Sequence, residues 1–249
     1  MTYGKDGLGS VRIDRKQTKM IAHRGLSGVE TENTLPSFRR AARGSYYGIE
    51  TDIHVTSDGR FAVFHDDTTK RMTDGKTEYT LENTDYATLR SLSLPDKWGH
   101  NGEGETFIPL LEEYIDACRS GDKYCVLELK NRFEEKDLIS AVEVIRGTGY
   151  LDRLIFISFS DFNCITMRRL LPEAKVQFLT TEEINGELIA FLKKERLDLD
   201  IEYKRLTKEN IALLHSENIE VNCWTVDDKK AAEDLAEWGV DYITSNILE

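Results

Sequence analysis

The sequence predicts an α/β protein built as a (β/α)₈ TIM barrel, with a small inserted segment after the hairpin of the second strand. Short β-rich runs alternate with helical patterns from residue 19 to the end of the chain. Eight strands enter this alternation, and eight βα units in one chain close into a parallel barrel. A length of 249 residues fits one such barrel, so we expect a single domain over residues 1–249.

The first strand and the first helix have separate signals. Residues 19–23 form an apolar run that stops before Gly25, which predicts a strand. Asn33 or Thr34 can cap the helix that follows, because Pro36 then lies in the first helical turn.

The second strand is expected at residues 48–55 and continues into a hairpin, because a turn at 57–59 precedes a β-rich run at 61–64. Residues 66–107 then interrupt the rhythm with glycines and charges. We interpret them as an insertion that carries one short helix near residues 84–91 and forms a lid or wall over the site.

The βα rhythm resumes after the insertion. Its helices are expected to use Asp161, Thr207 and Asp227 as N-caps, because each of these residues precedes a helical pattern. The remaining strands are expected at residues 124–129, 154–159, 176–179, 199–203, 219–224 and 240–244.

Composition limits the function. The formal net charge of −12 disfavours binding to nucleic acid or to an anionic membrane surface, since both need a basic face. We expect no stable membrane insertion, because no apolar run is long enough to span a bilayer. The start of the chain lacks a signal peptide, which predicts a cytoplasmic protein; an exported protein whose signal has been removed would look the same. The four scattered cysteines are expected to be buried thiols.

Carboxylates on two strands predict a metal site. Glu50, Asp52 and His54 share one face of the second strand, because side chains alternate along a strand. An isolated Glu-x-Asp pair is more often part of a salt bridge, but Glu128 adds a third carboxylate at the end of the next barrel strand, two residues before Lys130. Three carboxylates suit Mg²⁺ or Ca²⁺ and no soft metal.

Two histidines flank these acids in sequence. A pair such as His23 and His65 can serve as acid and base in one turnover, because imidazole titrates near pH ~6.5. Arg24 offers planar, permanently charged donors that match phosphate oxygens. Glu32 can either orient Arg24 or cap the first helix together with the residue that follows it.

The other aromatic and histidine candidates have competing interpretations. Trp224 follows a strand at the mouth of the barrel, where it can pack on the carbons of a small polyol or simply fill the core. His54 can lie in the outer shell of the site. His100 and His215 are expected to be structural.

The order of these residues resembles that of the glycerophosphodiester phosphodiesterases. The resemblance runs from about residue 19 to the end of the chain. It rests on His23-Arg24-Gly25, Glu32-Asn33-Thr34, Gly48-Ile49-Glu50-x-Asp52, Thr56-x-Asp58-Gly59, His65-Asp66, Arg71-x-Thr73, Ile108-Pro109-x-Leu111, Leu127-Glu128-Leu129-Lys130, Ser158-Phe159, Trp224-Thr225-Val226 and Gly239-Val240-Asp241.

The resemblance implies a TIM barrel with a small insertion and the hydrolysis of deacylated phospholipids to glycerol 3-phosphate and an alcohol. It also implies roles for individual residues. In that family's pattern the catalytic histidines are His23 and His65, the substrate phosphate is held by Arg24 and Lys130, and the metal ligands are Glu50, Asp52 and Glu128.

Two positions depart from the family pattern. Thr31 stands where a proline is usual, which should affect the stiffness of the loop more than the chemistry. The last strand ends in residues 244–247 without the usual Thr-Asp, so polar contacts at the rim are expected to differ.

Several alternatives stay open at this point. The nucleophile is water or the glycerol 2-hydroxyl, and either histidine can be the base. A phospholipase D-type activity would need an apolar groove, for which residues 79–98 supply apolar side chains that otherwise form a core of the insertion. A non-catalytic glycerophosphodiester-binding module and an unrelated barrel isomerase or aldolase fit the complete residue set less well. The expected partner is a small molecule, and the sequence does not predict the oligomeric state.

Overall fold

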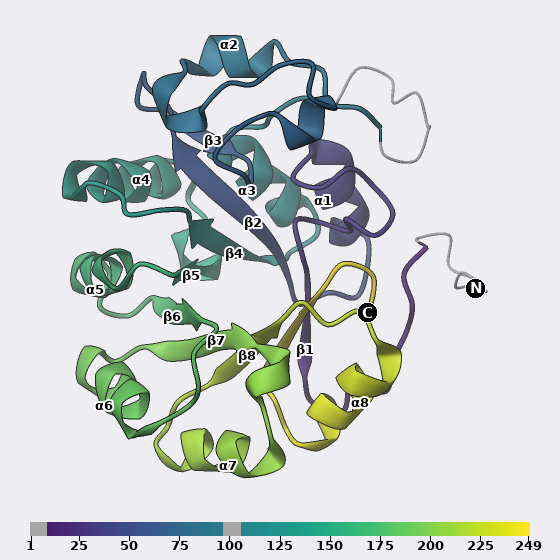
Figure 1. Cartoon of the computed structure of the whole chain (residues 1–249), viewed down its shortest axis with the longest axis vertical. Coiled ribbons are helices and arrows are strands. Elements are labelled where there is room, and N and C mark those ends of the chain that lie inside the picture. Colours follow the sequence, from purple (N-terminus) through teal and green to yellow (C-terminus); the bar gives the residue numbers. More distant parts are fainter. Residues whose placement is uncertain (1–8, 97–105) are drawn as a thin grey trace.

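A computed structural model describes residues 9–96 and 106–249, and it confirms the predicted barrel. The first strand pairs with both the second and the last, so the parallel sheet closes on itself. Helices surround the strands (Figure 1). The barrel strands are β1 (Lys19–Ala22), β2 (Gly48–Val55), β4 (Tyr124–Leu129), β5 (Leu154–Ser158), β6 (Lys175–Thr180), β7 (Asp198–Glu202), β8 (Val221–Trp224) and β9 (Tyr242–Ser245).

The connecting helices pack their apolar faces on the outside of this sheet. Residues 246–249, which follow β9, are not helical. The connecting helices are α1 (Leu35–Ala42), α3 (Leu111–Ser120), α4 (Glu135–Thr148), α5 (Asp161–Leu170), α6 (Gly186–Glu195), α7 (Lys208–Ser216) and α8 (Lys229–Glu237).

Two of the predicted helix caps are wrong by one residue. Helix α5 is capped by Ser160, whose hydroxyl accepts from the Asn163 amide at 3.3 Å, and the predicted Asp161 lies inside the first turn. Helix α8 is capped by Asp228, which leaves Asp227 free for a different role. Thr207 caps α7 as predicted.

The hairpin and the insertion lie beside β2. Strand β3 (Phe61–Val63) runs antiparallel to β2, and the predicted short helix is α2 (Tyr86–Arg90). Two 3₁₀ turns at Arg71–Thr73 and Leu81–Asn83 were not expected. The insertion buries its own apolar residues around Phe64, as one of the interpretations of the sequence predicted. These residues are Leu81, Leu89 and Leu94, together with Ala62 and Ile108.

The interior of the barrel provides an apolar floor for the polar residues at the strand ends. Ile21, Val126, Ile155, Leu179 and Tyr242 pack together inside the sheet. Because side chains alternate along each strand, the next inward-facing positions toward the C-terminal ends rise above this floor. Functional groups on those positions therefore share one end of the barrel.

Gly25 holds the loop after β1 close to helix α1. Its backbone has φ +75°, and a Cβ atom there would lie 2.3 Å from the Ser37 hydroxyl oxygen and 2.7 Å from the Ser37 backbone carbon. Only glycine permits both the positive φ and this close approach. The loop that carries His23 and Arg24 is therefore fixed against the first helix.

We expect Gly25→Ala to lower the free energy of unfolding by about 3 kcal/mol or more, because backbone strain and a steric clash add together. Gly149→Ala is the matched control, since Gly149 has φ +69° and nothing within 4 Å of the added Cβ. That variant should lose only about 1 kcal/mol from strain. Equal losses in urea unfolding of the two variants would contradict the role of the close approach.

Candidate active site

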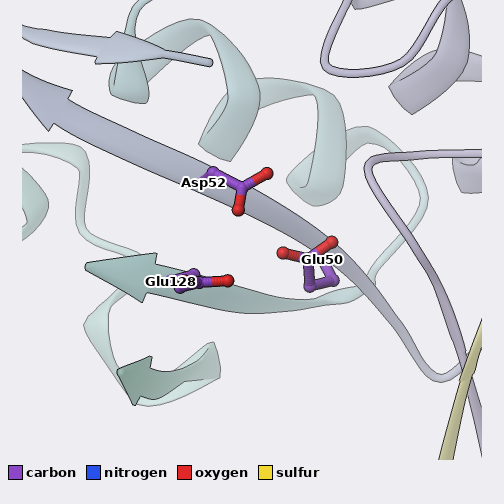
Figure 2. Close-up of side chains that lie close together, drawn as sticks. All are labelled: Glu50, Asp52 and Glu128. Carbon is purple, nitrogen blue, oxygen red and sulfur yellow. The ribbon is translucent and has the colours of Figure 1, made fainter. Parts of the chain in front are cut away.

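Three carboxyl groups meet at the C-terminal end of the barrel. Glu50 and Asp52 extend from β2, and Glu128 extends from β4, where it is the register partner of Asp52. All three are buried, and one oxygen of each lies within 4.8 Å of an oxygen of the other two. Figure 2 shows the three groups close together, with Glu50 and Asp52 on one strand and Glu128 on its neighbour. The acids that the sequence predicted to share a site are therefore together.

Asp52 is the one acid of the three with fixed positive partners on two sides. Its Oδ2 lies 3.6 Å from Arg24 Nε, and its Oδ1 lies 3.6 Å from Lys130 Nζ. Asn33 donates from Nδ2 to Asp52 Oδ2 at 2.8 Å. Burial opposes ionisation, but the charges of Arg24 and Lys130 outweigh it and lower the pKa of Asp52 to about 2.

Glu50 and Glu128 have less compensation. Burial and the neighbouring Asp52 charge raise the pKa of Glu50 well above its usual range. The same two causes raise the pKa of Glu128 to about 7, although Lys130 Nζ lies 2.9 Å from its Oε1. A hard divalent cation would relieve both groups, and an all-oxygen donor set of this kind fits Mg²⁺ or Ca²⁺. The three acids can therefore hold a metal ion.

His23 is oriented by Asn246, which directly follows the last strand, β9. Its Nδ1 donates to Asn246 Oδ1 at 2.8 Å, which leaves Nε2 pointing to the acids, 4.0 Å from Glu50 Oε2. Asn246 in turn donates to Asp227 at 2.6 Å. Burial and the charge of Arg24 lower the pKa of His23 to about 4, so the ring is neutral at pH 7.

The contact between His23 and Asn246 was not predicted from the sequence. Asp227 was assigned to a helix cap, and Asn246 was noted only because the rim departs from the family pattern. Asp227 and Asn246 lie 19 positions apart, and both are near the C-terminal end of the chain, whereas His23 is near its start. No local pattern could have joined them.

His65 is held by an acid next to it in sequence. Its Nδ1 donates to Asp66 Oδ1 at 2.7 Å, and Arg71 binds the same carboxylate through Nε at 2.6 Å. Burial lowers the pKa of His65, with a further contribution from the charge of Arg24. Arg71 comes from the insertion, so the described part of the insertion reaches the site through a charged residue.

Glu32 joins the two halves of the site. Its carboxylate accepts from Arg24 at 2.8 Å and from Arg71 at 2.7 Å. The expectation that Glu32 orients Arg24 is thus supported by a direct contact. The alternative that Asn33 caps the first helix is wrong, because Thr34 is the cap and Asn33 bonds to Asp52.

Six of these groups line one cavity of about 230 Å³: the two imidazoles, Arg24, Lys130, Glu50 and Glu128. Both imidazoles line it, which places them on the same volume as the acids. On one side the cavity is charged, and on the other it is mostly apolar. Its lining residues are His23, Arg24, Glu50, His65, Glu128, Lys130, Ile157, Phe159, Leu179, Asp200, Trp224, Thr225 and Thr244.

Trp224 forms part of the apolar side. Its ring meets Phe159 edge to face, with the ring centroids 5.7 Å apart, and Phe159 is 49% exposed. The remaining histidines lie elsewhere: His54 is buried beside the backbone of His65, and His215 pairs with Asp241 at the surface. His100 lies outside the described residues. All four cysteines are buried thiols, as expected.

Residues 23–248 match the sequence model of the Glycerophosphoryl diester phosphodiesterase family. The chain belongs to this family. A glycerophosphodiester phosphodiesterase of Caldanaerobacter subterraneus is 28% identical over 239 residues, which are 92% of this chain and 94% of that protein. A second one, from Bacillus altitudinis, is 28% identical over 91% of this chain and 93% of its own length.

Solved structures of the same family share the fold. A phosphodiesterase from Oleispira antarctica, solved in complex with the product sn-glycerol-3-phosphate, has a TM-score of 0.85 and 26% identity, and covers 95% of this chain and 96% of its own. A glycerophosphodiester phosphodiesterase from Parabacteroides distasonis has a TM-score of 0.78 and 28% identity, with coverage of 92% and 93%. Among the described helices of this family member, none has the length and apolarity needed to cross a bilayer.

We expect the protein to bind one Mg²⁺ or Ca²⁺ ion, and Asp52→Asn to weaken binding by at least about tenfold, because a charged ligand is lost. Binding should also be weaker at pH 6 than at pH 8, since the pKa of Glu128 is raised to about 7 and a proton then competes with the ion. Calorimetry at both pH values measures this. Asp198→Asn, near the other end of the barrel interior, is the matched control; equal weakening in both variants would contradict the assignment.

Proposed function

We propose that this chain is a metal-dependent hydrolase that cleaves glycerophosphodiesters to sn-glycerol 3-phosphate and an alcohol. The observation that carries the proposal is the cavity itself: two imidazoles, two fixed cations and two acids, Glu50 and Glu128, line one small volume, and Asp52 lies beside these acids. Family membership supports the reaction class. The Oleispira antarctica phosphodiesterase, which has a TM-score of 0.85 to this chain, was solved with its product sn-glycerol-3-phosphate.

The phosphate of the substrate would lie between Arg24 and Lys130. Arg24 is held in place by Glu32 at 2.8 Å, and Lys130 by Glu128 at 2.9 Å, so both cations are positioned before the substrate arrives. Donors that are already in place stabilise the charge that develops on the phosphate oxygens. A divalent cation held by the three acids would neutralise phosphate charge and polarise the phosphorus.

The two imidazoles would move the protons. The Nδ1 atoms of His23 and His65 are engaged by Asn246 and Asp66, which leaves each Nε2 atom for the reacting groups. One ring takes the proton of the attacking hydroxyl, and the other delivers a proton to the leaving oxygen. Each ring has its own hydrogen-bond partner, so one imidazole can be protonated while the other is neutral during a turnover.

The apolar half of the cavity suits a small alcohol better than an acyl chain. Ile157, Leu179 and Trp224 form a short wall inside the barrel mouth. The apolar residues of the insertion are mostly buried in its own core. Among its described residues, the large apolar side chain that is exposed is Tyr79, at 38%. Trp98 lies outside the described residues. We therefore propose glycerophosphodiesters, and not lysophospholipids, as the substrates.

Product analysis with glycerophosphocholine tests the reaction directly. We expect stoichiometric sn-glycerol 3-phosphate and choline, loss of turnover after chelation, and recovery with Mg²⁺ or Ca²⁺. His23→Ala and His65→Ala should each lower kcat by about 10²- to 10⁴-fold, because each removes one proton transfer. His215→Ala is the control, since this exposed histidine pairs with Asp241 and is not among the residues that line the cavity. Near wild-type turnover in either active-site variant, or activity that resists chelation, would refute the mechanism.

Asn246→Leu should lower kcat by about 10- to 100-fold, because the ring of His23 loses the acceptor that sets its orientation. The KM should change little, since Asn246 does not line the cavity. In the double variant with His23→Ala, the Asn246 change should cost nothing further. Additive losses in steady-state kinetics would show that Asn246 acts independently of His23.

A further inference from the structure

A buried carboxyl group lies across the cavity from the metal-binding acids. Asp200 extends from β7, is 1% exposed and lines the cavity. Strand β7 is separated from β2 by three strands in either direction around the sheet, so the two strands face each other across the barrel. The proposed chemistry gives this carboxyl group no task.

One oxygen of the Asp200 carboxyl group has no hydrogen-bond partner within residues 9–96 and 106–249. Its Oδ2 accepts from Asn222 Nδ2 at 3.1 Å, and Oδ1 is buried without a hydrogen bond among the described residues. The Asn222 amide is fixed by a second contact, because Nδ2 also donates to Gln177 Oε1 at 3.1 Å. A buried polar atom without a partner is costly, so such an atom on a cavity wall indicates a ligand that supplies the missing bond.

The same wall offers an unpaired donor. The indole Nε1 of Trp224 is buried and also lacks a hydrogen-bond partner in the described part of the chain. The wall continues from β7 to β6 and β5 with Leu179 and Ile157, and Leu179 is the register partner of Asp200. The wall thus combines an unpaired acceptor, an unpaired donor and an apolar surface.

A hydroxyl group is the ligand that can bond to both kinds of atom, because it donates to an acceptor and accepts from a donor. A quaternary ammonium group such as that of choline offers nothing to the indole N–H. The carbons of a short polyol would pack on the apolar surface and on the indole ring. The cavity, at about 230 Å³, suits a small alcohol.

We propose that Asp200 and the indole N–H of Trp224 form a hydroxyl-binding subsite that recognises the glycerol portion of the substrate. This subsite rests on the proposed function, and it selects the glycerol side of the diester over the head group. The terminal hydroxyl, the one farthest from phosphorus, is the group bound. Discrimination against diesters without that hydroxyl therefore comes from Asp200.

The test compares two substrates in the metal-loaded full chain. One is glycerophosphocholine, and the other is its analogue without the hydroxyl at glycerol carbon 1, which keeps the 2-hydroxyl and the head group. The wild type should prefer glycerophosphocholine by roughly 10- to 100-fold in kcat/KM. Asp200→Leu should reduce kcat/KM for glycerophosphocholine by a similar factor and leave the analogue unchanged, so the preference falls to about one.

Two further variants control for structural damage. Asp200→Asn keeps the size and an acceptor oxygen, and it should retain part of the preference. Asp198→Asn makes the same chemical change two residues earlier on the same strand, where Oδ1 accepts from the Glu220 amide, and it should retain the full preference.

A binding measurement keeps the proposal testable without turnover. In the presence of Mg²⁺, sn-glycerol 3-phosphate should raise the melting temperature of the wild type more than propane-1,2-diol 1-phosphate does. Asp200→Leu should respond equally to both. An unchanged preference in Asp200→Leu, or equal losses on both substrates, would overturn the subsite. A wild type that cleaves no phosphodiester would instead overturn the proposed function, so the two failures are distinguishable.

Discussion

The mutual repulsion of three buried carboxyl groups is the constraint on which the rest of this site depends. Glu50, Asp52 and Glu128 are placed together by strand register, and burial alone would keep them protonated. Arg24 and Lys130 keep Asp52 ionised, but they leave Glu50 and Glu128 with raised pKa values. The barrel thus holds two acids, Glu50 and Glu128, whose ionisation a bound divalent cation would favour.

The same charges organise the residues around the cavity. Arg24 binds Glu32, Glu32 binds Arg71, Arg71 binds Asp66, and Asp66 holds the ring of His65. This chain of contacts joins the loop after β1 to the insertion after β3. The imidazole of His23 is held independently, by Asn246 just after the last strand. Two rings with separate supports can approach one phosphate from different sides, which acid–base catalysis of a diester requires.

The sequence predicted those features that strand geometry controls. Strand alternation places Glu50 and Asp52 on one face, and the shared C-terminal end of a parallel barrel places Glu128 beside them. The contact of Asn246 with His23 and the unpaired oxygen of Asp200 were not predictable, because each depends on segments distant in sequence. The predicted caps of α5 and α8 were one residue away from the observed caps, Ser160 and Asp228, because the neighbouring residues are also good cap residues. The sequence alone does not show at which of two such residues the helix begins.

The most direct test is a crystal structure of the protein with Mn²⁺ and sn-glycerol 3-phosphate, because Mn²⁺ prefers the same oxygen ligands as Mg²⁺ and its anomalous scattering locates it. The account predicts one anomalous peak among the carboxylates of Glu50, Asp52 and Glu128. It also predicts a single phosphate within hydrogen-bonding distance of both His23 and His65. A metal bound elsewhere, or a phosphate in contact with only one of the two rings, would contradict it.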